Sequence, residues 1–115
     1  MSVPDAVWRL ERRLWVDGGA AYPEIVAPEA IMALPGMGFM SGADATRAME
    51  GMEGWQSVAM EEPRAEEPAE SLALLFYRGE GVRPDGSAYA AYCTSTYCAA
   101  DGGWRLVQHQ QTPVT

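Results

Sequence analysis

The only imidazole of this 115-residue chain belongs to His109, which lies in its last dozen residues. An imidazole can take up or give a proton near neutral pH, and it can also hold a ligand by a hydrogen bond. Asp101-Gly102-Gly103 precedes it, and these residues tolerate a positive φ angle, so residues 89–98 can turn back and pair with a closing strand. We therefore expect any histidine chemistry on the last strand of a terminal hairpin.

A carboxylate in the first helix is the second candidate. Pro4 suits a first helical turn and Gly18-Gly19 supplies a stop, so the pattern predicts a helix over about residues 4 to 16. At about 100° per residue, Glu11 falls near the middle of the apolar arc of this helix. A buried carboxylate is costly unless it is paired, hydrogen-bonded or next to a wet cavity. Glu11 is thus either the acid–base partner of His109 or part of a structural ion pair.

The composition excludes several classes of site. All eight basic residues are Arg, and the lack of Lys excludes Schiff-base chemistry, a lysine-anchored pyridoxal cofactor and a P-loop lysine. With one His, the chain cannot build a three-histidine zinc site or a two-histidine iron site within one subunit. We expect neither a metal nor a cofactor.

Both cysteines fall in one predicted strand, at Cys93 and Cys98. A spacing of five residues puts them on opposite faces and roughly 16 Å apart, whereas a disulfide needs Cα atoms within about 7 Å. Cys93 also lacks the helix terminus or oxyanion donors that would activate a thiol. Free thiols, a beginning without a signal-peptide pattern and the lack of a long apolar stretch predict a cytoplasmic protein.

The net charge of −8 opposes a nucleic-acid or membrane partner. Much of this charge lies in residues 61–70, whose two prolines should interrupt a strand and whose carboxylates favour solvent. We expect a solvated hairpin tip there, with a surface for a basic partner as the alternative.

The length predicts a single domain over residues 1–115. A strand is expected over about residues 30–34, a helix over 43–52 with Ser41 and Asp44 at its start, and another strand over 55–62. Residues 71–81 and 87–98 should form a hairpin around Arg83-Pro84-Asp85-Gly86. We expect Val82 opposite Ser87 in this hairpin, and Cys98 opposite Trp104 in the terminal one.

This register divides the predicted sheet into two faces. The first carries His109 with Leu72, Leu74, Phe76, Arg78, Ala91, Cys93, Ser95, Tyr97, Arg105, Val107 and Gln111. The second carries Ala73, Leu75, Tyr77, Tyr92, Thr94, Thr96, Leu106, Gln108 and Gln110. Neither is a simple solvent face. Because helices in so short a chain can cover only one face, the other needs a partner, and we predict a homodimer.

The His109 face combines aliphatic side chains with a few polar groups, as small-molecule sites do. The predicted ligand-binding residues are Trp15, Phe76, Arg78, Cys93, Ser95, Tyr97, Arg105 and Gln111. Glu11 could instead be the counter-ion of Arg78 or Arg105, and His109 could simply bind a backbone carbonyl.

Several segments, in order and spacing, resemble nuclear-transport-factor-2-like domains, in particular the small bacterial domain of unknown function 4440 and its SnoaL-like relatives. They are Val16-Asp17-Gly18-Gly19, residues 25–32, residues 36–43 and the closing Asp101-Gly102-Gly103-Trp104-Arg105-Leu106-Val107-Gln108-His109-Gln110-Gln111-Thr112-Pro113. The resemblance implies an α+β fold, in which a cone-shaped curved antiparallel sheet wraps around two or three N-terminal helices (a cystatin-like roll). It also implies dimers paired sheet to sheet.

The steroid-isomerase branch of this superfamily keeps an Asp before a proline, where this chain has Leu34 before Pro35. The matching tyrosine falls at or beside Leu10 and Glu11, so that chemistry is not supported. SnoaL-like cyclases and limonene-epoxide-type hydrolases use Asp, Arg or Asn sets that cannot be traced here, and the chain has no Asn. Three functions stay open: a protein that binds a small apolar or amphipathic molecule, an isomerase, cyclase or hydrolase using His109 with Glu11, and a structural association domain with a filled cavity.

Overall fold

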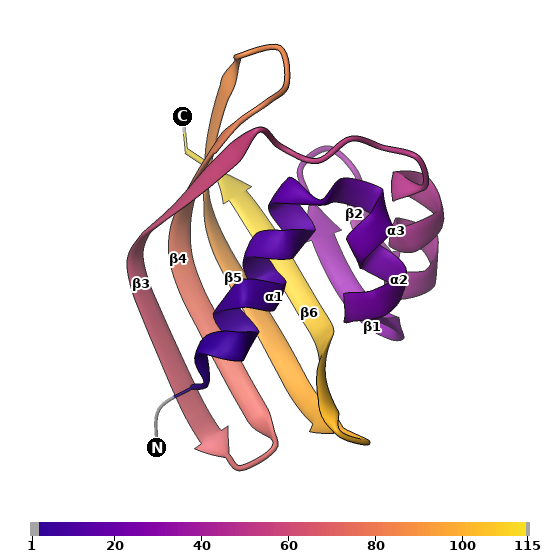
Figure 1. Ribbon diagram of the computed structural model, residues 1–115, viewed down its shortest axis with the longest axis vertical. Coiled ribbons are helices and arrows are strands. Elements are labelled where there is room, and N and C mark those ends of the chain that lie inside the picture. Colours follow the sequence, from indigo (N-terminus) through magenta and orange to yellow (C-terminus); the bar gives the residue numbers. More distant parts are fainter. Residues whose placement is uncertain (1–2, 115) are drawn as a thin grey trace.

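The computed structural model describes residues 3–114, which form a curved six-stranded sheet with helices on one face (Figure 1). The strand order is β2-β1-β6-β5-β4-β3. The elements are α1 (Asp5–Val16), the 3-10 helix η1 (Gly18–Ala21), α2 (Tyr22–Ile25), β1 (Val26–Leu34), β2 (Gly38–Ser41), α3 (Gly42–Met49), β3 (Ser57–Ala69), β4 (Leu72–Val82), β5 (Ala88–Ala100) and β6 (Gly103–Pro113). The predicted α+β class is confirmed. We call the helix-covered side of the sheet the inner face and the other side the outer face.

Helix α1 lies across the inner face, as its apolar arc predicts (Figure 1). Its buried residues are Val7, Glu11 and Trp15, which follow one another at intervals of four residues. Gly18 ends it with φ +65, and a Cβ there would come within 2.5 Å of the backbone at Met52 and Gly54. Only glycine allows the chain to turn so close to the loop before β3.

The sheet is not wholly antiparallel as expected, because β1 runs parallel to β6. β1 begins at Val26, earlier than predicted, and pairs with β2 through a short hairpin. The hydroxyl of Ser41 accepts a hydrogen bond from the Asp44 amide at 3.1 Å, which confirms the predicted start of α3.

The acidic segment forms most of edge strand β3, so the predicted solvated hairpin tip was wrong. An edge strand has one side without ladder hydrogen bonds, and it therefore tolerates Pro63 and Pro68. The register shifts between Glu61 and Arg64, and Glu62 takes a positive φ of 53. Such bulges and charges protect an exposed edge from pairing with another chain.

The register of the β4–β5 hairpin differs from the prediction by one residue. Arg83, not Val82, bonds to Ser87 across the turn, and Val82 pairs with Ala88. A shift of one residue exchanges the two faces of a strand. Consequently β4 turns Ala73, Leu75 and Tyr77 inward, and Leu72, Leu74, Phe76 and Arg78 outward.

The terminal hairpin departs from the prediction twice. Cys98 pairs with Arg105 instead of Trp104, and a bulge at Thr96/Tyr97 then adds a second shift in β6. The two shifts together restore the predicted parity for His109, which pairs with Ser95 on the inner face. Before the bulge the expected faces are exchanged, so Leu106 is buried and Arg105 lies outside.

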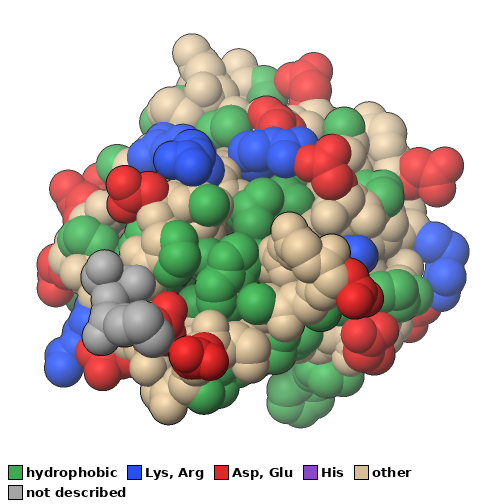
Figure 2. Space-filling model, turned by 60° about the horizontal axis from the view of Figure 1, so that its bottom comes forward, with side chains coloured by type: hydrophobic (Ala, Val, Ile, Leu, Met, Phe, Trp, Pro, Cys, Tyr) green, Lys and Arg blue, Asp and Glu red, His purple; other side chains and the backbone are tan. Residues whose placement is uncertain are grey.

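Two clusters fill the space between the helices and the inner face. The larger includes Ile25, Met32, Leu75, Tyr97 and Leu106, and the smaller joins Trp15, Val58, Tyr77, Ala91 and Cys93. The β3–β4 and β5–β6 turns lie at the base of the molecule (Figure 1). Figure 2 shows hydrophobic side chains at the centre of this end, bordered by Arg and by Asp and Glu.

Both cysteines lie in β5 as free thiols, Cys93 buried and Cys98 partly exposed. No helix within residues 3–114 is long and apolar enough to span a bilayer.

Candidate functional site

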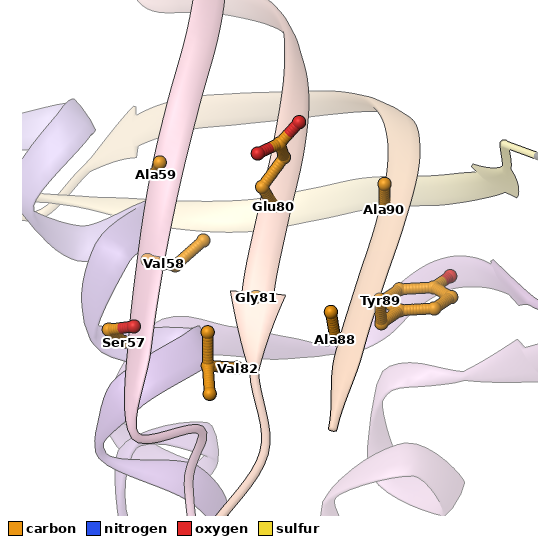
Figure 3. A pocket seen from close by; sticks show the side chains of 9 residues that line it. All are labelled: Ser57, Val58, Ala59, Glu80, Gly81, Val82, Ala88, Tyr89 and Ala90. Atoms are coloured by element: carbon orange, nitrogen blue, oxygen red, sulfur yellow. The ribbon is translucent and has the colours of Figure 1, made fainter. Parts of the chain in front are cut away.

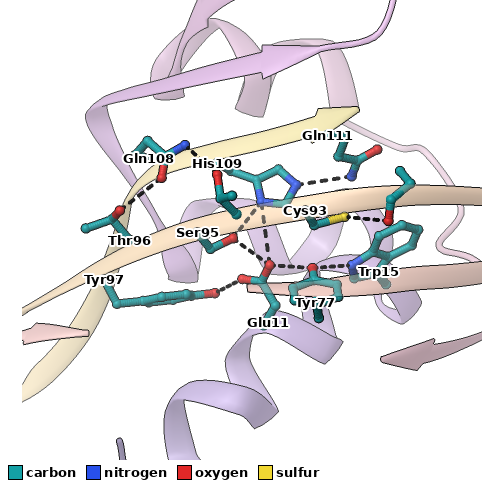
Figure 4. A network of polar contacts seen from close by, with 12 residues as sticks. Glu11, Trp15, Tyr77, Cys93, Ser95, Thr96, Tyr97, Gln108, His109 and Gln111 are labelled. Atoms are coloured by element: carbon teal, nitrogen blue, oxygen red, sulfur yellow. Dashed lines mark hydrogen bonds and ion pairs between the residues drawn. The ribbon is translucent and has the colours of Figure 1, made fainter. Parts of the chain in front are cut away.

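A buried carboxylate stands at the centre of the inner face. Glu11 is 0% exposed and accepts hydrogen bonds from three hydroxyls (Figure 4). Tyr77 donates at 2.5 Å and Ser95 at 2.6 Å to Oε2, while Tyr97 donates at 2.7 Å to Oε1. These three donors compensate for the loss of water that makes burial of a carboxylate costly.

His109 adjoins this carboxylate from the neighbouring strand and is 5% exposed. Its Nδ1 lies 2.6 Å from the Ser95 hydroxyl oxygen and 3.5 Å from Glu11 Oε2. Its Nε2 lies 3.1 Å from Gln111 Nε2. Both nitrogens of the ring are therefore engaged.

The surrounding bonds assign the tautomer of His109. Tyr89 donates to Gln111 Oε1 at 2.9 Å, so the amide nitrogen of Gln111 faces His109 and donates to Nε2. His109 then carries its proton on Nδ1 and donates to Ser95, whose hydroxyl donates to Glu11. The result is a directed chain of hydrogen bonds from Tyr89, near the surface, to Glu11 in the interior.

Burial sets the protonation of this network. Burial lowers the pKa of His109, and the charge of Glu11 opposes that effect. Burial, reinforced by the charge of Glu11, raises the pKa values of Tyr77 and Tyr97 well above the ordinary value. At neutral pH the imidazole is therefore neutral and both tyrosines are protonated donors.

Cys93 lies beside the network without joining it. Its thiol points to the carbonyl of Ala91 at 3.6 Å. Burial, with a further contribution from Glu11, raises its pKa to about 12. A thiol with so high a pKa is not a nucleophile at neutral pH.

Serine, histidine and glutamate are the residue types of a hydrolase triad, but their arrangement differs. In a triad the carboxylate and the serine bind opposite nitrogens of the imidazole. Here Ser95 and Glu11 both lie at Nδ1 of His109. The network could make His109 Nε2 a general base only for a molecule that displaces Gln111 from it.

The cavity next to this network is small. Its volume is about 50 Å³, and Glu11, His109 and Gln111 line it together with Trp15, Trp55, Leu14, Gly18, Tyr22, Met32, Met49, Glu53 and Gly54. This space suits one or two water molecules, not the apolar molecule expected from the sequence. Within residues 3–114 no group of three His, Cys, Asp or Glu side chains could hold a metal ion.

Aromatic rings close the cavity at Trp15. Its indole donates to the Tyr77 hydroxyl at 3.0 Å and packs 5.2 Å from the ring of Trp55. Gly79 and Gly81 make room for these indoles, because a Cβ on Gly81 would come within 2.7 Å of Trp55. The cone is thus filled by the side chains of the chain itself.

The structure brings most of the predicted site residues together on the inner face. They are Glu11, Trp15, Cys93, Ser95, Tyr97, His109 and Gln111. Three others face outward: Phe76, Arg78 and Arg105. Arg78 pairs with Glu61 and Glu80, and Arg105 bonds to the carbonyl of Val26, so neither is the counter-ion of Glu11.

Sequence reasoning missed Tyr77, a direct partner of Glu11, because the predicted register put it on the opposite face. It also missed Tyr89, which holds Gln111 in place. A predicted register with Arg83 opposite Ser87 would have placed Tyr77 on the same face as Glu11.

A wider depression lies on the outer face, over the start of β3, the end of β4 and the start of β5 (Figure 3). Its volume is about 630 Å³, and it is lined by Ser57, Val58, Ala59, Glu80, Gly81, Val82, Ala88, Tyr89 and Ala90. The Glu80 carboxylate stands without a second acid or base among these side chains. The depression therefore has space but no set of groups for catalysis.

No protein-family model matches the chain, and no curated protein matches its sequence. Solved structures do share its fold. An NTF2-like protein of unknown function in nutrient uptake from Rhodospirillum rubrum superposes with a TM-score of 0.80 at 13% identity, covering 99% of this chain and 100% of that one. The CamKII hub homology domain of Chlamydomonas reinhardtii gives 0.79 at 19% identity, covering 100% of both chains.

A type 2 hexachlorocyclohexane dehydrochlorinase gives a TM-score of 0.63 at 16% identity and covers 94% of this chain and 84% of that one. At such identities the likeness shows the fold alone, and this fold is nuclear-transport-factor-2-like, as the sequence resemblance implied. The narrower placement among domains of unknown function 4440 stays a prediction.

Proposed function

We propose that the protein is an association module that forms a homodimer through the outer face of its sheet. The observation that supports this best is a pair of residue rows that cross all six strands in the middle of that face. One row is Phe39, Ala33, Gln110, Thr94, Phe76 and Arg64, and the other is Ser41, Ile31, Gln108, Thr96, Leu74 and Glu66. Charge occurs in these rows only at edge strand β3.

The rows expose hydrophobic side chains that a monomer would leave in water. Phe39 is 84% exposed and Ile31 is 51% exposed, and Tyr92 beside the rows is 55% exposed. Exposed large hydrophobic side chains gathered on one face of a small protein are typical of a contact surface.

The polar side chains of the rows bond to one another. Thr96 donates to Gln108 at 2.9 Å, and Gln108 donates to Thr94 at 3.1 Å. Because these groups already have protein partners, covering them costs less than covering groups that depend on water. A partner that covers Thr94, Thr96 and Gln108 therefore leaves fewer polar atoms unsatisfied.

The area of the outer face is close to that of a standard dimer interface. Six strands about 4.8 Å apart span about 24 Å, and nine residues of strand extend about 30 Å, so the face measures about 700 Å². A standard interface buries about 800 Å² per partner. The outer face alone comes close to this requirement.

The filled interior favours an association role over storage of a ligand, because the cavity holds only about 50 Å³. The same fold occurs in a hub homology domain, so an assembly role on this fold has a precedent. We also propose that the dimer is cytoplasmic, and the two free thiols support that location.

A second function has a specific observation in its favour. The relay from Gln111 through His109 and Ser95 to Glu11 could activate His109 toward a small polar molecule that replaces the Gln111 amide. The fold also occurs in a dehydrochlorinase. This candidate, an enzyme or a binding protein for a small polar ligand, requires the cavity to widen.

Sedimentation equilibrium at micromolar concentration tests the association role. We expect twice the chain mass of 12.5 kDa for the wild type and a shift toward monomer for Thr94→Glu, since an unpaired charge buried in an interface costs several kcal/mol. Ala20→Glu adds the same charge at the exposed residue of η1, away from the outer face, and should stay dimeric. A wild type that sediments as a monomer contradicts the proposal.

A further inference from the structure

We propose that the two copies dock antiparallel across the middle of the outer face, with Arg64 of each copy paired to the partner's Glu66. The twofold axis then runs across the strands, between the row that contains Thr94 and the row that contains Thr96. This inference rests on the proposed dimer and adds its orientation. A second copy of this chain is the occupant because the two rows match in chemistry on the four inner strands and carry opposite charges on β3.

On the central strands the rows carry side chains of the same class. β4 offers Phe76 and Leu74, and β5 offers Thr94 and Thr96. β6 offers two amides, Gln110 and Gln108. β1 offers two aliphatic side chains, Ala33 and Ile31. A twofold axis between the rows lays each row on the other row of the partner. On these four strands apolar groups then meet apolar groups, and hydroxyls and amides meet their own kind. On β2, Phe39 meets the partner's Ser41.

At edge strand β3 the two rows carry opposite charges. Arg64 ends one row and Glu66 ends the other, and both are exposed. Among the described residues neither has an ion-pair partner, whereas Arg78 on the same face is paired with Glu61 and Glu80. The proposed axis lays β3 on the partner's β3 and brings Arg64 to the partner's Glu66 twice, once on each side of the axis. Complementary charge of this kind sets the orientation of a contact.

The competing orientation has its axis along the strands and lays β2 on the partner's β3. Arg64 would then lie over the partner's Phe39, and Glu66 over the partner's Ser41. In that arrangement the two charges have no opposite charge to meet. The face area of about 700 Å² is used equally in both cases, so charge complementarity decides between them.

Charge exchange separates the orientations. We expect Arg64→Glu alone, or Glu66→Arg alone, to weaken the dimer about tenfold, because each places like charges together twice. The double variant Arg64→Glu/Glu66→Arg restores the pairs and should return the dissociation constant to within about threefold of the wild type. Arg9→Glu, on the exposed side of α1, changes the net charge as Arg64→Glu does and should leave the dimer intact.

The measurement is sedimentation equilibrium at low salt and again at 0.5 M NaCl, where screening should shrink the effect of the single variants. A double variant as weak as the single variants overturns the orientation. The orientation is also overturned if Phe39→Ala weakens the dimer while neither Arg64→Glu nor Glu66→Arg does. Thr94→Glu tests whether the outer face is used, in either orientation. A dimer that Thr94→Glu weakens but the charge exchange does not would contradict only the orientation, and the proposed function would stand.

Discussion

The Nδ1 atom of His109 lies 3.5 Å from the Oε2 atom of Glu11, although the two residues are at opposite ends of the chain. The Ser95 hydroxyl stands within 2.6 Å of both atoms. The neutral imidazole, protonated at Nδ1, thus contacts the carboxylate in two ways. One is the hydrogen bond through the Ser95 hydroxyl, and the other is the direct electrostatic contact between Nδ1 and Oε2. This relationship joins α1 to the central strands, and it predicts how the protein responds to pH and to substitution.

Glu11→Gln should lower the pKa of His109 further below its ordinary value. Burial lowers this pKa and the Glu11 charge raises it, so removal of the charge leaves burial unopposed. NMR titration of the imidazole in wild type and variant measures the difference. Identical titration curves would mean that the two groups are not coupled.

The stability of the fold should fall as the pH drops below about 6.5. The folded-state pKa of His109 is lowered, so the unfolded chain binds a proton in this range before the folded chain does. Each pH unit between the unfolded and folded pKa values then costs up to about 1.4 kcal/mol. Urea unfolding between pH 7 and pH 5 measures the slope. His109→Gln should have a smaller slope over this range, and equal slopes would remove the histidine from the explanation.

Tyr97→Phe should destabilise the protein by about 1 to 3 kcal/mol, because it takes one donor from a carboxylate that remains buried. Tyr92→Phe removes the hydroxyl of a side chain that is 55% exposed and should change stability by less than about 0.5 kcal/mol. Urea unfolding at pH 7 compares them. Equal effects would show that the hydrogen bond to Glu11 contributes little.

Gly81→Ala should cost about 1 to 3 kcal/mol, because its Cβ would meet the Trp55 ring at 2.7 Å. Gly103→Ala meets nothing within 4 Å and serves as the matched control. Thermal unfolding followed by tryptophan fluorescence reports both stability and the packing of Trp55. A neutral Gly81→Ala would contradict the tight closure of the cavity.

Only one thiol should react in the native protein. Cys93 is buried with a pKa raised to about 12, whereas Cys98 is partly exposed on the outer face. At a concentration low enough for the chains to be monomeric, an aromatic disulfide reagent at pH 8 should modify one thiol per chain. In Cys98→Ser the reagent should modify no thiol until the protein unfolds. Two fast thiols in the wild type would place Cys93 nearer to solvent than the structure does.

The candidate site was predictable where one periodicity decided the matter. The helical period alone places Glu11 on the buried side of α1, and strand alternation places Ser95 and Tyr97 on one face. Tyr77 depended on the exact length of the β4–β5 turn, which the sequence Arg83-Pro84-Asp85-Gly86 does not determine. A single residue there reverses the whole strand.

The predicted face of His109 was right because two one-residue shifts, one at the terminal turn and one at the bulge beside Tyr97, add to two residues and restore the alternation. Bulges leave little trace in a sequence. The parallel pairing of β1 with β6 and the continuation of β3 through Pro63 and Pro68 depend on where each strand lies in the sheet. Local patterns cannot show whether a strand is at an edge.

Intermolecular NOEs from a mixture of ¹³C-labelled and unlabelled protein test the proposed dimer most directly. The methyl groups of Thr94, Thr96, Leu74 and Ile31 on the outer face should all show contacts across the interface, with Thr94 contacting the partner's Thr96. The methyl group of Ala73, buried on the inner face, should show none. A dimer without intermolecular contacts at Thr94 and Thr96, or a sample that stays monomeric at NMR concentration, would contradict association through this face.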